Sequence, residues 1–186
     1  MSYFNTDPNA WYAISDSSGG FNTTLYGGGA GIEHAVYVAP ANFSNIDAYW
    51  QIILVSGSHS IFTFRNRATG PQNCLDVNFN AAEVDPSHTQ PALEPGDPPS
   101  TSQQWTIQGW GGDSNNFTSY QIQNVGNGTN FDLDDHPGNP LFLSSYTGKT
   151  PTQQWIFSSL GAINDASFST NAAVSFQLPR HTANSS

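Results

Sequence analysis

The sequence contains few charged residues and very few basic ones. Lys and Arg together number four against fourteen Asp and Glu, which gives a formal net charge of −10. Nucleic acids and anionic membrane surfaces are both bound through clustered Lys and Arg, so we expect neither as a partner. The longest apolar run, residues 52–55, is far too short to span a bilayer, so no membrane insertion is expected.

Cysteine is almost absent as well. Cys74 is the single cysteine, so no intrachain disulfide can form. We expect it to be a buried structural thiol and not a nucleophile. The first residues lack the basic start and apolar stretch of a signal peptide, which favours a cytoplasmic protein, with export without a signal peptide as the alternative.

Motifs for catalysis and for metal binding are missing. The sequence has no Gly-x-Ser-x-Gly, no His-Glu-x-x-His and no phosphate-binding loop, and its five His show no metal-ligand spacing. The densest acidic run, residues 132–136, matches no EF-hand loop, so a solvated turn is the preferred interpretation over a Ca²⁺ site. We therefore expect no enzyme, no cofactor and no metal.

Aromatic and turn-forming residues are abundant by contrast. The 186 residues include twelve Phe, seven Tyr, five Trp, 17 Gly and 12 Pro. This mixture favours short strands joined by tight turns, with the aromatic rings in one core. Apolar residues at helical spacing are scarce, so the sequence predicts a single all-β domain.

A tryptophan motif is repeated along the chain. The tripeptide 103–105, Gln-Gln-Trp, recurs unchanged at 153–155, and Tyr-Trp-Gln at 49–51 is an eroded third copy. The three tryptophans are 55 and then 50 residues apart, at the upper edge of the periods of repeat architectures. The repeat predicts three related units, and the tryptophans are expected to lie in the core.

Each unit opens with an alternating stretch that reads as a strand, at residues 11–16, 61–66 and 120–124. Each stretch ends in Asp or Asn, which can start a turn through side-chain to backbone hydrogen bonds. The units are predicted at 11–57, 60–110 and 117–160. Residues 1–10 form an N-terminal segment and 161–186 a C-terminal extension, in which residues 174–178 are expected to add an edge strand or to pack on the outside.

A second shared element lies inside the units. Cys74-Leu75-Asp76-Val77 in the second unit corresponds to Phe131-Asp132-Leu133 in the third, because each places an Asp between apolar residues. The first unit has no Asp in the matching stretch, residues 22–26. The proline-rich residues 85–102 predict an irregular surface excursion, and the glycine-rich residues 27–31 a flexible turn.

Taken together, these residues resemble the ricin B-type (R-type) lectins, β-trefoils marked by a repeated Gln-x-Trp. The resemblance covers about residues 11–160, and the low charge and lack of disulfides are similar to the intracellular members known from fungi. It implies a β-trefoil with pseudo-threefold repeats that binds glycans or glycoconjugates at shallow sites. In such a site an Asp accepts hydrogen bonds from sugar hydroxyls, an aromatic ring on the following strand stacks on the sugar, and polar residues beside Gln-x-Trp complete the contact.

Carried over residue by residue, the resemblance implies sites in two units. The third unit supplies Asp132, Asp135, Asn139, Tyr146 and Gln153, and the second unit supplies Asp76, Gln90 and Gln103. Two positions differ from the family pattern, because Ser102 and Thr152 stand where its sugar sites usually have Asn. No aromatic residue other than Tyr146 is identified for the stacking role.

Other interpretations of the same residues stay open. The Gln of each Gln-x-Trp could equally bond to the backbone and lock a turn, and the Asp residues could cap turns. The second functional hypothesis is a β-trefoil that binds a protein through its loops, such as a protease inhibitor, with residues 85–102 as the binding loop. A homodimer is a further partner option.

Overall fold

The computed structural model describes residues 4–17, 22–29, 32–77, 89–96, 99–110, 119–126, 131–135, 141–145 and 150–170. Its regular elements are β-strands and short 3-10 helices, which confirms the predicted all-β class. None of the helices in these ranges is long and apolar enough to cross a membrane. The strands are β1 (Ala10–Asp16), β2 (Thr23–Gly29), β3 (Ile32–Pro40), β4 (Trp50–Leu54), β5 (Ile61–Asn66), β6 (Asn73–Val77), β7 (Pro91–Pro95), β8 (Trp105–Trp110), β9 (Ser119–Asn124), β10 (Phe131–Asp134), β11 (Phe142–Ser145) and β12 (Trp155–Ala162).

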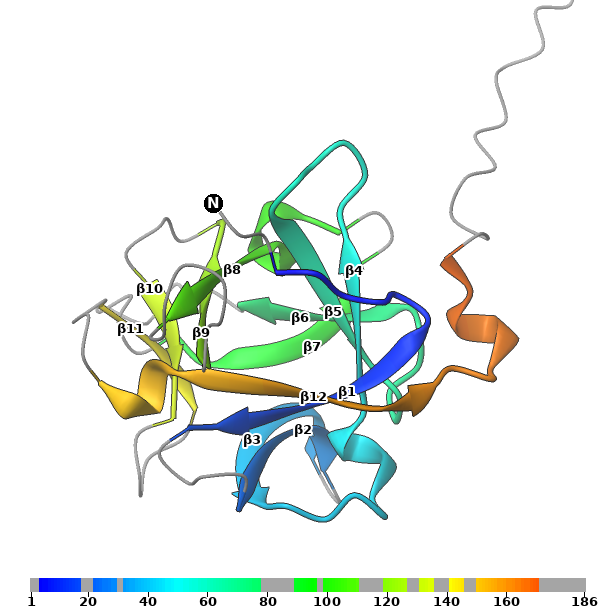
Figure 1. Cartoon of the computed structure of the whole chain (residues 1–186), viewed down its shortest axis with the longest axis horizontal. Coiled ribbons are helices and arrows are strands. Elements are labelled where there is room, and N and C mark those ends of the chain that lie inside the picture. The colour runs from blue at the N-terminus through cyan, green and yellow to red at the C-terminus, as the bar shows by residue number, and fades with distance from the viewer. Residues whose placement is uncertain are drawn as a thin grey trace, which may run out of the picture.

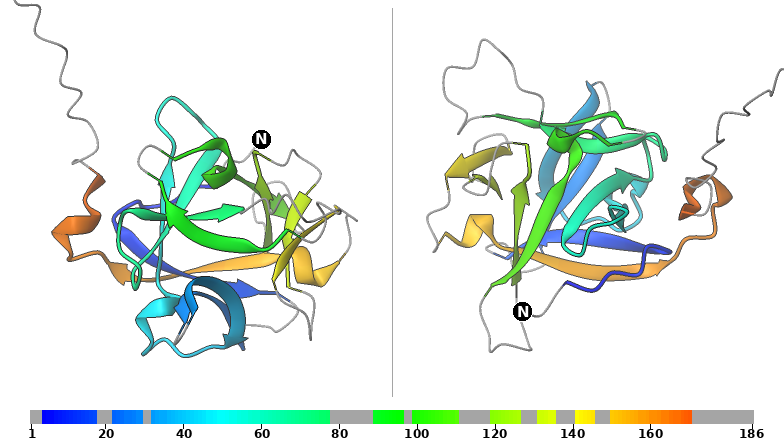
Figure 2. Two further views of the ribbon diagram at one scale, coloured as in Figure 1. Left: turned by 180° about the vertical axis from the view of Figure 1, so that it is seen from behind. Right: turned by 90° about the horizontal axis from the view of Figure 1, so that it is seen from above.

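Six strands close into a barrel. Antiparallel pairing runs from β1 through β4, β5, β8, β9 and β12, and β12 pairs back with β1. Three hairpins are attached to this ring, β2–β3, β6–β7 and β10–β11, one in each unit (Figures 1 and 2). A six-stranded barrel with one hairpin per unit is a β-trefoil, as the sequence predicts.

The three tryptophans form the centre of the core. Trp50, Trp105 and Trp155 are completely buried, which confirms their predicted role. Each indole Nε1 donates a hydrogen bond of 2.9 Å to the backbone oxygen of a leucine in the hairpin of its own unit, namely Leu25, Leu75 and Leu133. A buried indole N–H needs a partner. The bond therefore fixes each hairpin to its tryptophan and shows which residues of the three units are equivalent.

Of the strand-ending residues, Asn66 starts a turn, as predicted. Asn66 Nδ2 donates to Asp47 O and Asn124 Nδ2 donates to Ser102 O, each at 2.7 Å. Asn66 Oδ1 also accepts a hydrogen bond of 2.9 Å from the N–H of Ala68. Because these bonds join the end of one unit to the start of the next, the Asn residues hold neighbouring units together.

The expectation of a flexible turn at residues 27–31 is wrong for its first part. Residues 27–29 belong to β2, with an irregular register between Gly27 and Gly29. A Cβ at Gly27 would lie 2.7 Å from the Asn66 side chain and 2.9 Å from Leu93. Glycine is present there because two neighbouring side chains pack directly against the strand backbone.

The expectation of an irregular excursion over residues 85–102 is also partly wrong. Residues 91–95 form β7, which pairs with β6 along its full length, from Asn73↔Pro95 to Val77↔Pro91. The prolines misled the prediction. They stand at the two ends of the strand, where a missing N–H costs little of the hydrogen-bond ladder.

The N-terminal segment and residues 163–170 pack on the trefoil at different places. Phe4 lies among Phe62, Tyr120 and Phe157, at ring-centroid distances of 5.9, 4.7 and 4.6 Å. These three rings belong to β5, β9 and β12, so Phe4 touches barrel strands of two units. After β12, residues 163–170 continue through η5 (Ala166–Phe168) and pack beside β1 (Figure 1). Residues 174–178 lie outside the described part.

Candidate functional site

The hairpin of the third unit has one apolar and one polar face. Ile122, Leu133 and Leu143 of β9, β10 and β11 point into the core and are completely buried. Strand alternation sends their neighbours to the opposite face. That face therefore carries Gln121, Gln123, Asp132, Asp134 and Ser144, an unusual concentration of hydrogen-bonding groups.

The indole hydrogen bonds show which hairpin residues of the three units occupy equivalent positions. Because Leu25, Leu75 and Leu133 are equivalent, the residues that follow them are equivalent too: Tyr26, Asp76 and Asp134. The predicted correspondence between Asp76 and Asp132 is therefore wrong by two residues, and Asp132 corresponds to Thr24 and Cys74. The error arose because the third unit has Asp on both sides of Leu133, and a sequence pattern cannot distinguish them.

Asp134 is held by the Gln of the second Gln-x-Trp. Gln153 Nε2 donates to Asp134 Oδ2 at 3.1 Å, to Ser144 Oγ at 2.5 Å and to Ser145 O at 3.2 Å, and Ser144 Oγ also donates to Asp134 Oδ2. Asp134 is 4% exposed, and its Oδ1 atom is buried without a hydrogen-bond partner. One carboxylate oxygen is thus fixed by the protein, and the other is a buried acceptor that accepts no hydrogen bond from the described residues.

An aromatic ring lies opposite this acid. The Cα of Asp134 pairs with that of Phe142 on β11, and Phe142 is partly exposed. At the equivalent positions, Tyr26 pairs with Tyr37 in the first unit and Asp76 with Ala92 in the second. Sequence reasoning missed Phe142. The sequence signal for Phe142 was its position directly before Leu143. Leu143 is equivalent to Leu93 of the second unit, but only the strand register shows this equivalence.

Asp132 is the more deeply buried acid of β10, with an exposed fraction of 0%. Burial raises the pKa of its carboxyl from 3.8 to about 6. A hydrogen bond from Gln123 acts in the opposite direction, and the charge of Asp134 adds to the increase. Gln121 Nε2 lies 3.5 Å from Oδ2, and Oδ1 has no partner.

The other predicted residues of the third unit have different positions. Asp135 is partly buried at the end of β10, where its N–H donates to Thr152 O at 3.0 Å. Thr152, in the position where the family usually has Asn, is buried and its Oγ1 has no hydrogen-bond partner. Asn139 and Tyr146 lie outside the described residues.

The predicted residues of the second unit are not joined to one another. Asp76 is partly buried and its Oδ1 accepts a bond of 2.6 Å from the N–H of Val77. Gln103 is buried, and its Nε2 donates to Glu94 O at 3.2 Å and Pro95 O at 3.0 Å. Gln90 is exposed, directly before β7. Within the described ranges no hydrogen bond links these three side chains, and Gln103 locks the β7 end of its unit.

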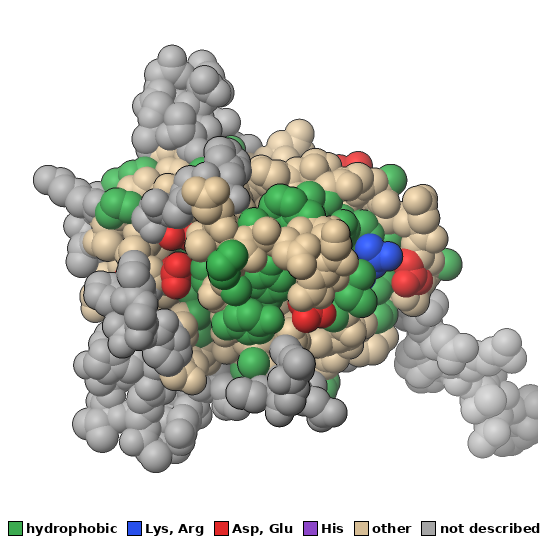
Figure 3. Space-filling model, turned by 90° about the horizontal axis from the view of Figure 1, so that it is seen from below, with side chains coloured by type: hydrophobic (Ala, Val, Ile, Leu, Met, Phe, Trp, Pro, Cys, Tyr) green, Lys and Arg blue, Asp and Glu red, His purple; other side chains and the backbone are tan. Residues whose placement is uncertain are grey.

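In the first unit a tyrosine occupies the acid position. The hydroxyl of Tyr26 donates to Pro40 O at 2.8 Å and accepts from Asn42 N at 2.7 Å, and its ring stacks on Tyr37 at 5.4 Å. Nearby, Phe43 and Ile46 are 43% and 46% exposed. The face of the molecule seen in Figure 3 shows apolar side chains gathered with few charged ones among them. Among the described residues of the β2–β3 hairpin, no carboxylate takes the position of Asp134.

A metal has no evident place among these groups. Within the part of the chain that the structure describes, no three His, Cys, Asp or Glu side chains come together as ligands. The polar face of the third unit is built from two carboxylates, amides and a hydroxyl. Such groups are suited to exchanging hydrogen bonds with a neutral hydroxylated molecule.

The class of protein that this fold defines is the β-trefoil, in the form that ricin B-like lectins have. No protein-family model matches the sequence, and no curated protein matches it. Similar folds occur among solved structures. The BEL β-trefoil superposes with a TM-score of 0.63 at 16% identity, over 86% of this chain and 100% of that one.

Two further structures show the same likeness. The Macrolepiota procera ricin B-like lectin, solved in complex with lactose, has a TM-score of 0.59 at 18% identity, over 83% of this chain and 99% of that one. Cry35Ab1 has a TM-score of 0.61 at 20% identity, over 86% of this chain. This chain spans only 38% of the length of Cry35Ab1. At these identities the likeness establishes the fold.

Proposed function

We propose that this protein is a carbohydrate-binding lectin whose main site is the polar face of the third unit. The observation that carries the proposal is the register of β10 and β11. Only this unit sets an acid, Asp134, opposite an aromatic ring, Phe142, while the Gln-x-Trp glutamine Gln153 bonds to the same acid. The lactose complex of a ricin B-like lectin with this fold supports the substrate class.

The chemistry of the site suits a sugar. The Oδ1 atom of Asp134 accepts a hydrogen bond from a sugar hydroxyl, and bonds to a carboxylate are about twice as strong as neutral ones. A buried acceptor without a partner costs free energy, and a sugar hydroxyl recovers that cost. Phe142 contacts the apolar face of the sugar ring.

Other predicted residues complete this site. Asp135 follows Asp134 directly, and Asn139 and Tyr146 precede and follow β11 in the sequence. We assign these three residues to hydroxyl contacts around the edge of the site. Asp132 is fully buried on the same strand, so we assign it to the interior of the site and not to direct contact with the sugar.

The second unit is proposed as a weaker site. Asp76 is its acceptor and Gln90 its exposed neighbour, but Ala92 offers no ring for stacking. Gln103 shapes this site through the backbone of β7. We therefore expect sugar affinity at the second unit to be well below that at the third.

A glycan array tests the proposal, followed by calorimetry with the best glycan. Wild type should bind, Asp134→Ala should bind at least tenfold more weakly, and the comparison variant Asp76→Ala should change affinity less. Circular dichroism checks that all three proteins fold alike. Full binding by Asp134→Ala, or a silent array with folded wild type, would contradict the proposal.

The protein-binding alternative has lost much of its basis. It depended on residues 85–102 as a long irregular loop, but residues 91–95 form a hydrogen-bonded strand. Residues 101–103 form η3 (Thr101–Gln103), which is held through Gln103 against the end of β7. The described part of this stretch is therefore part of the trefoil body.

A further inference from the structure

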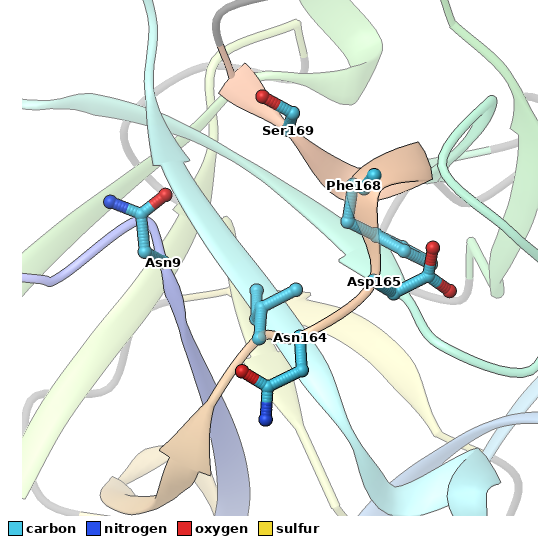
Figure 4. A pocket seen from close by; sticks show the side chains of 7 residues that line it. Asn9, Asn164, Asp165, Phe168 and Ser169 are labelled. Atoms are coloured by element: carbon cyan, nitrogen blue, oxygen red, sulfur yellow. The ribbon is translucent and has the colours of Figure 1, made fainter.

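A hollow of about 290 Å³ lies between the N-terminal segment and residues 163–169, outside the polar faces of the three units. One wall is Asn9 of the N-terminal segment, and the other is the C-terminal arm, residues 163–169. Figure 4 shows Asn9 on one side, with Asn164, Asp165, Phe168 and Ser169 around the other. The hairpins of the trefoil units contribute nothing to the lining.

The two walls are fixed relative to each other. Ile163 N donates to Asn9 O at 2.7 Å. The completely buried Gln51 of β4 uses a single amide nitrogen to bond both walls, at 2.8 Å to Pro8 O and 2.9 Å to Phe168 O. Phe168 is buried against Trp11, with ring centroids 4.8 Å apart. The hollow is therefore preformed, and Gln51 sets its width.

The lining offers matched hydrogen-bonding groups. Ser167 N and Ser167 Oγ both donate to Asp165 Oδ1, at 2.9 and 2.6 Å, and these bonds hold the pKa of the Asp165 carboxyl below its usual value. That carboxylate is oriented, ionised and exposed, and its Oδ2 accepts no hydrogen bond from the described residues. The carboxamides of Asn9 and Asn164 each supply donors and an acceptor, and Ile163 adds an apolar surface.

We propose that this hollow is a second carbohydrate site, which takes a neutral, monosaccharide-sized polyol ring. Its volume is at the small end of ligand pockets, which excludes a large ligand. Among the described lining residues the charged one is the acidic Asp165, which disfavours an anionic ligand. Sugar hydroxyl groups match the carboxamides of Asn9 and Asn164 and the carboxylate of Asp165 at the edge of the hollow, and the ring's C–H groups match Ile163.

The hollow and the third-unit face lie on opposite sides of the molecule. η5 and the β10–β11 hairpin are at opposite ends in Figure 1, and the views in Figure 2 agree. The new site therefore does not depend on the function proposed above. With both sites occupied, one protein molecule would hold two sugars that face away from each other.

Saturation-transfer NMR on the full chain tests the proposal, with the methyl glycosides of galactose, glucose, mannose and N-acetylglucosamine as probes. The double variant Asp76→Ala/Asp134→Ala removes the acceptors of both trefoil sites proposed above and should retain a signal from at least one glycoside. Adding Asn9→Ala and Asp165→Ala should weaken that binding at least tenfold. Asn164→Trp in the same background should also abolish it, because the indole fills the hollow while the Asp165–Ser167 bonds remain.

The outcomes separate the two proposals. If no glycoside gives a signal with Asp76→Ala/Asp134→Ala, the hollow is not a sugar site, whereas loss relative to wild type still supports the trefoil sites. If the signal survives both the Asn9/Asp165 change and Asn164→Trp, the hollow is likewise refuted. Binding of methylammonium without any glycoside would refute the ligand class. Unchanged melting temperatures confirm that the variants fold.

Discussion

Two aspartates on one strand show how position decides chemistry at the scale of the residue. Asp132 and Asp134 lie two residues apart on the same face of β10, and neither is paired with a basic residue in the described part. Asp134 is tied to Gln153 and Ser144, and its Oδ1 is the proposed sugar acceptor. Asp132 is fully buried among amides, so its carboxyl resists ionisation.

The first prediction concerns Asp132→Asn and the dependence of stability on pH. Since the pKa of Asp132 is raised to about 6, the folded protein holds this proton more tightly than the unfolded chain. The proton on Asp132 therefore stabilises the folded protein. This stabilisation is complete below about pH 4, decreases as the pH rises to about 6 and stays lost above that. The total loss is at most about 3 kcal/mol. Urea unfolding at pH 4, 5, 6 and 7 measures it.

The two proteins are compared by the slope of unfolding free energy against pH. Other carboxyl groups titrate in both proteins, so their effect cancels in the difference. Asp132→Asn should gain stability relative to wild type from pH 4 to 6. Parallel curves would show that Asp132 ionises normally in the folded state.

At the scale of the element, the two Gln-x-Trp copies have the same architectural role and different hydrogen-bond partners. Both tryptophans bond to their hairpin in the same way. Gln103 bonds only to backbone groups, those of Glu94, Pro95 and Ser100. Gln153 bonds to backbone and also to the side chains of Asp134 and Ser144. Gln103 thus locks a turn through backbone groups, whereas Gln153 also holds Asp134, the proposed sugar acceptor.

The second prediction separates these roles. Gln103→Ala should lower the unfolding free energy by about 1–3 kcal/mol, because it leaves buried backbone groups unpaired, and should leave sugar binding at the third unit unchanged. Gln153→Ala should cost similar stability and also weaken sugar binding at least fivefold. Urea unfolding and calorimetry with the same glycan measure both quantities. Equal effects of the two changes on binding would refute the distinction.

The third prediction uses Gly96, which lies against Gln103. A Cβ on Gly96 would meet Gln103 Oε1 at 2.3 Å and Cδ at 2.7 Å, so Gly96→Ala must displace that side chain. Gly96→Ala should destabilise the protein about as much as Gln103→Ala, by about 1–3 kcal/mol. In a Gln103→Ala background the same glycine change should cost much less. Additive costs in this double-mutant cycle would contradict the packing argument.

At the scale of the whole molecule, one aromatic side chain of the N-terminal segment packs against the barrel. Phe4 contacts Phe62, Tyr120 and Phe157, which come from three different barrel strands. Tyr120 and Phe157 also contact each other, at 5.5 Å. A segment outside the repeat thereby becomes part of the core shared by the second and third units.

The fourth prediction is that Phe4→Ala destabilises the whole domain. Removal of a partly buried ring from this cluster should cost about 2 kcal/mol. Phe43→Ala is the matched control, because Phe43 is 43% exposed and its loss should change stability by less than about 0.5 kcal/mol. Urea unfolding of the three proteins measures both. Equal stability of Phe4→Ala and wild type would show that the segment is not part of the core.

The sequence by itself determined the repeat, the all-β class, the buried tryptophans and the turn at Asn66. Each is a local pattern, because alternation, a recurring tripeptide and an Asn at a strand end can be recognised without knowing which strands pair. The same patterns predict a site in the third unit that includes Gln153, and the position of that site stays a prediction.

Only the tertiary structure decided which acid and which ring meet there. The paired residues Tyr26 and Tyr37, Asp76 and Ala92, and Asp134 and Phe142 are separated by 11, 16 and 8 residues. Hairpin loops of different length destroy the alignment in sequence, while hydrogen-bonded register restores it in space. The hollow between the N-terminal segment and residues 163–169 was invisible for the same reason, because its walls are more than 150 residues apart in sequence and are joined by Gln51.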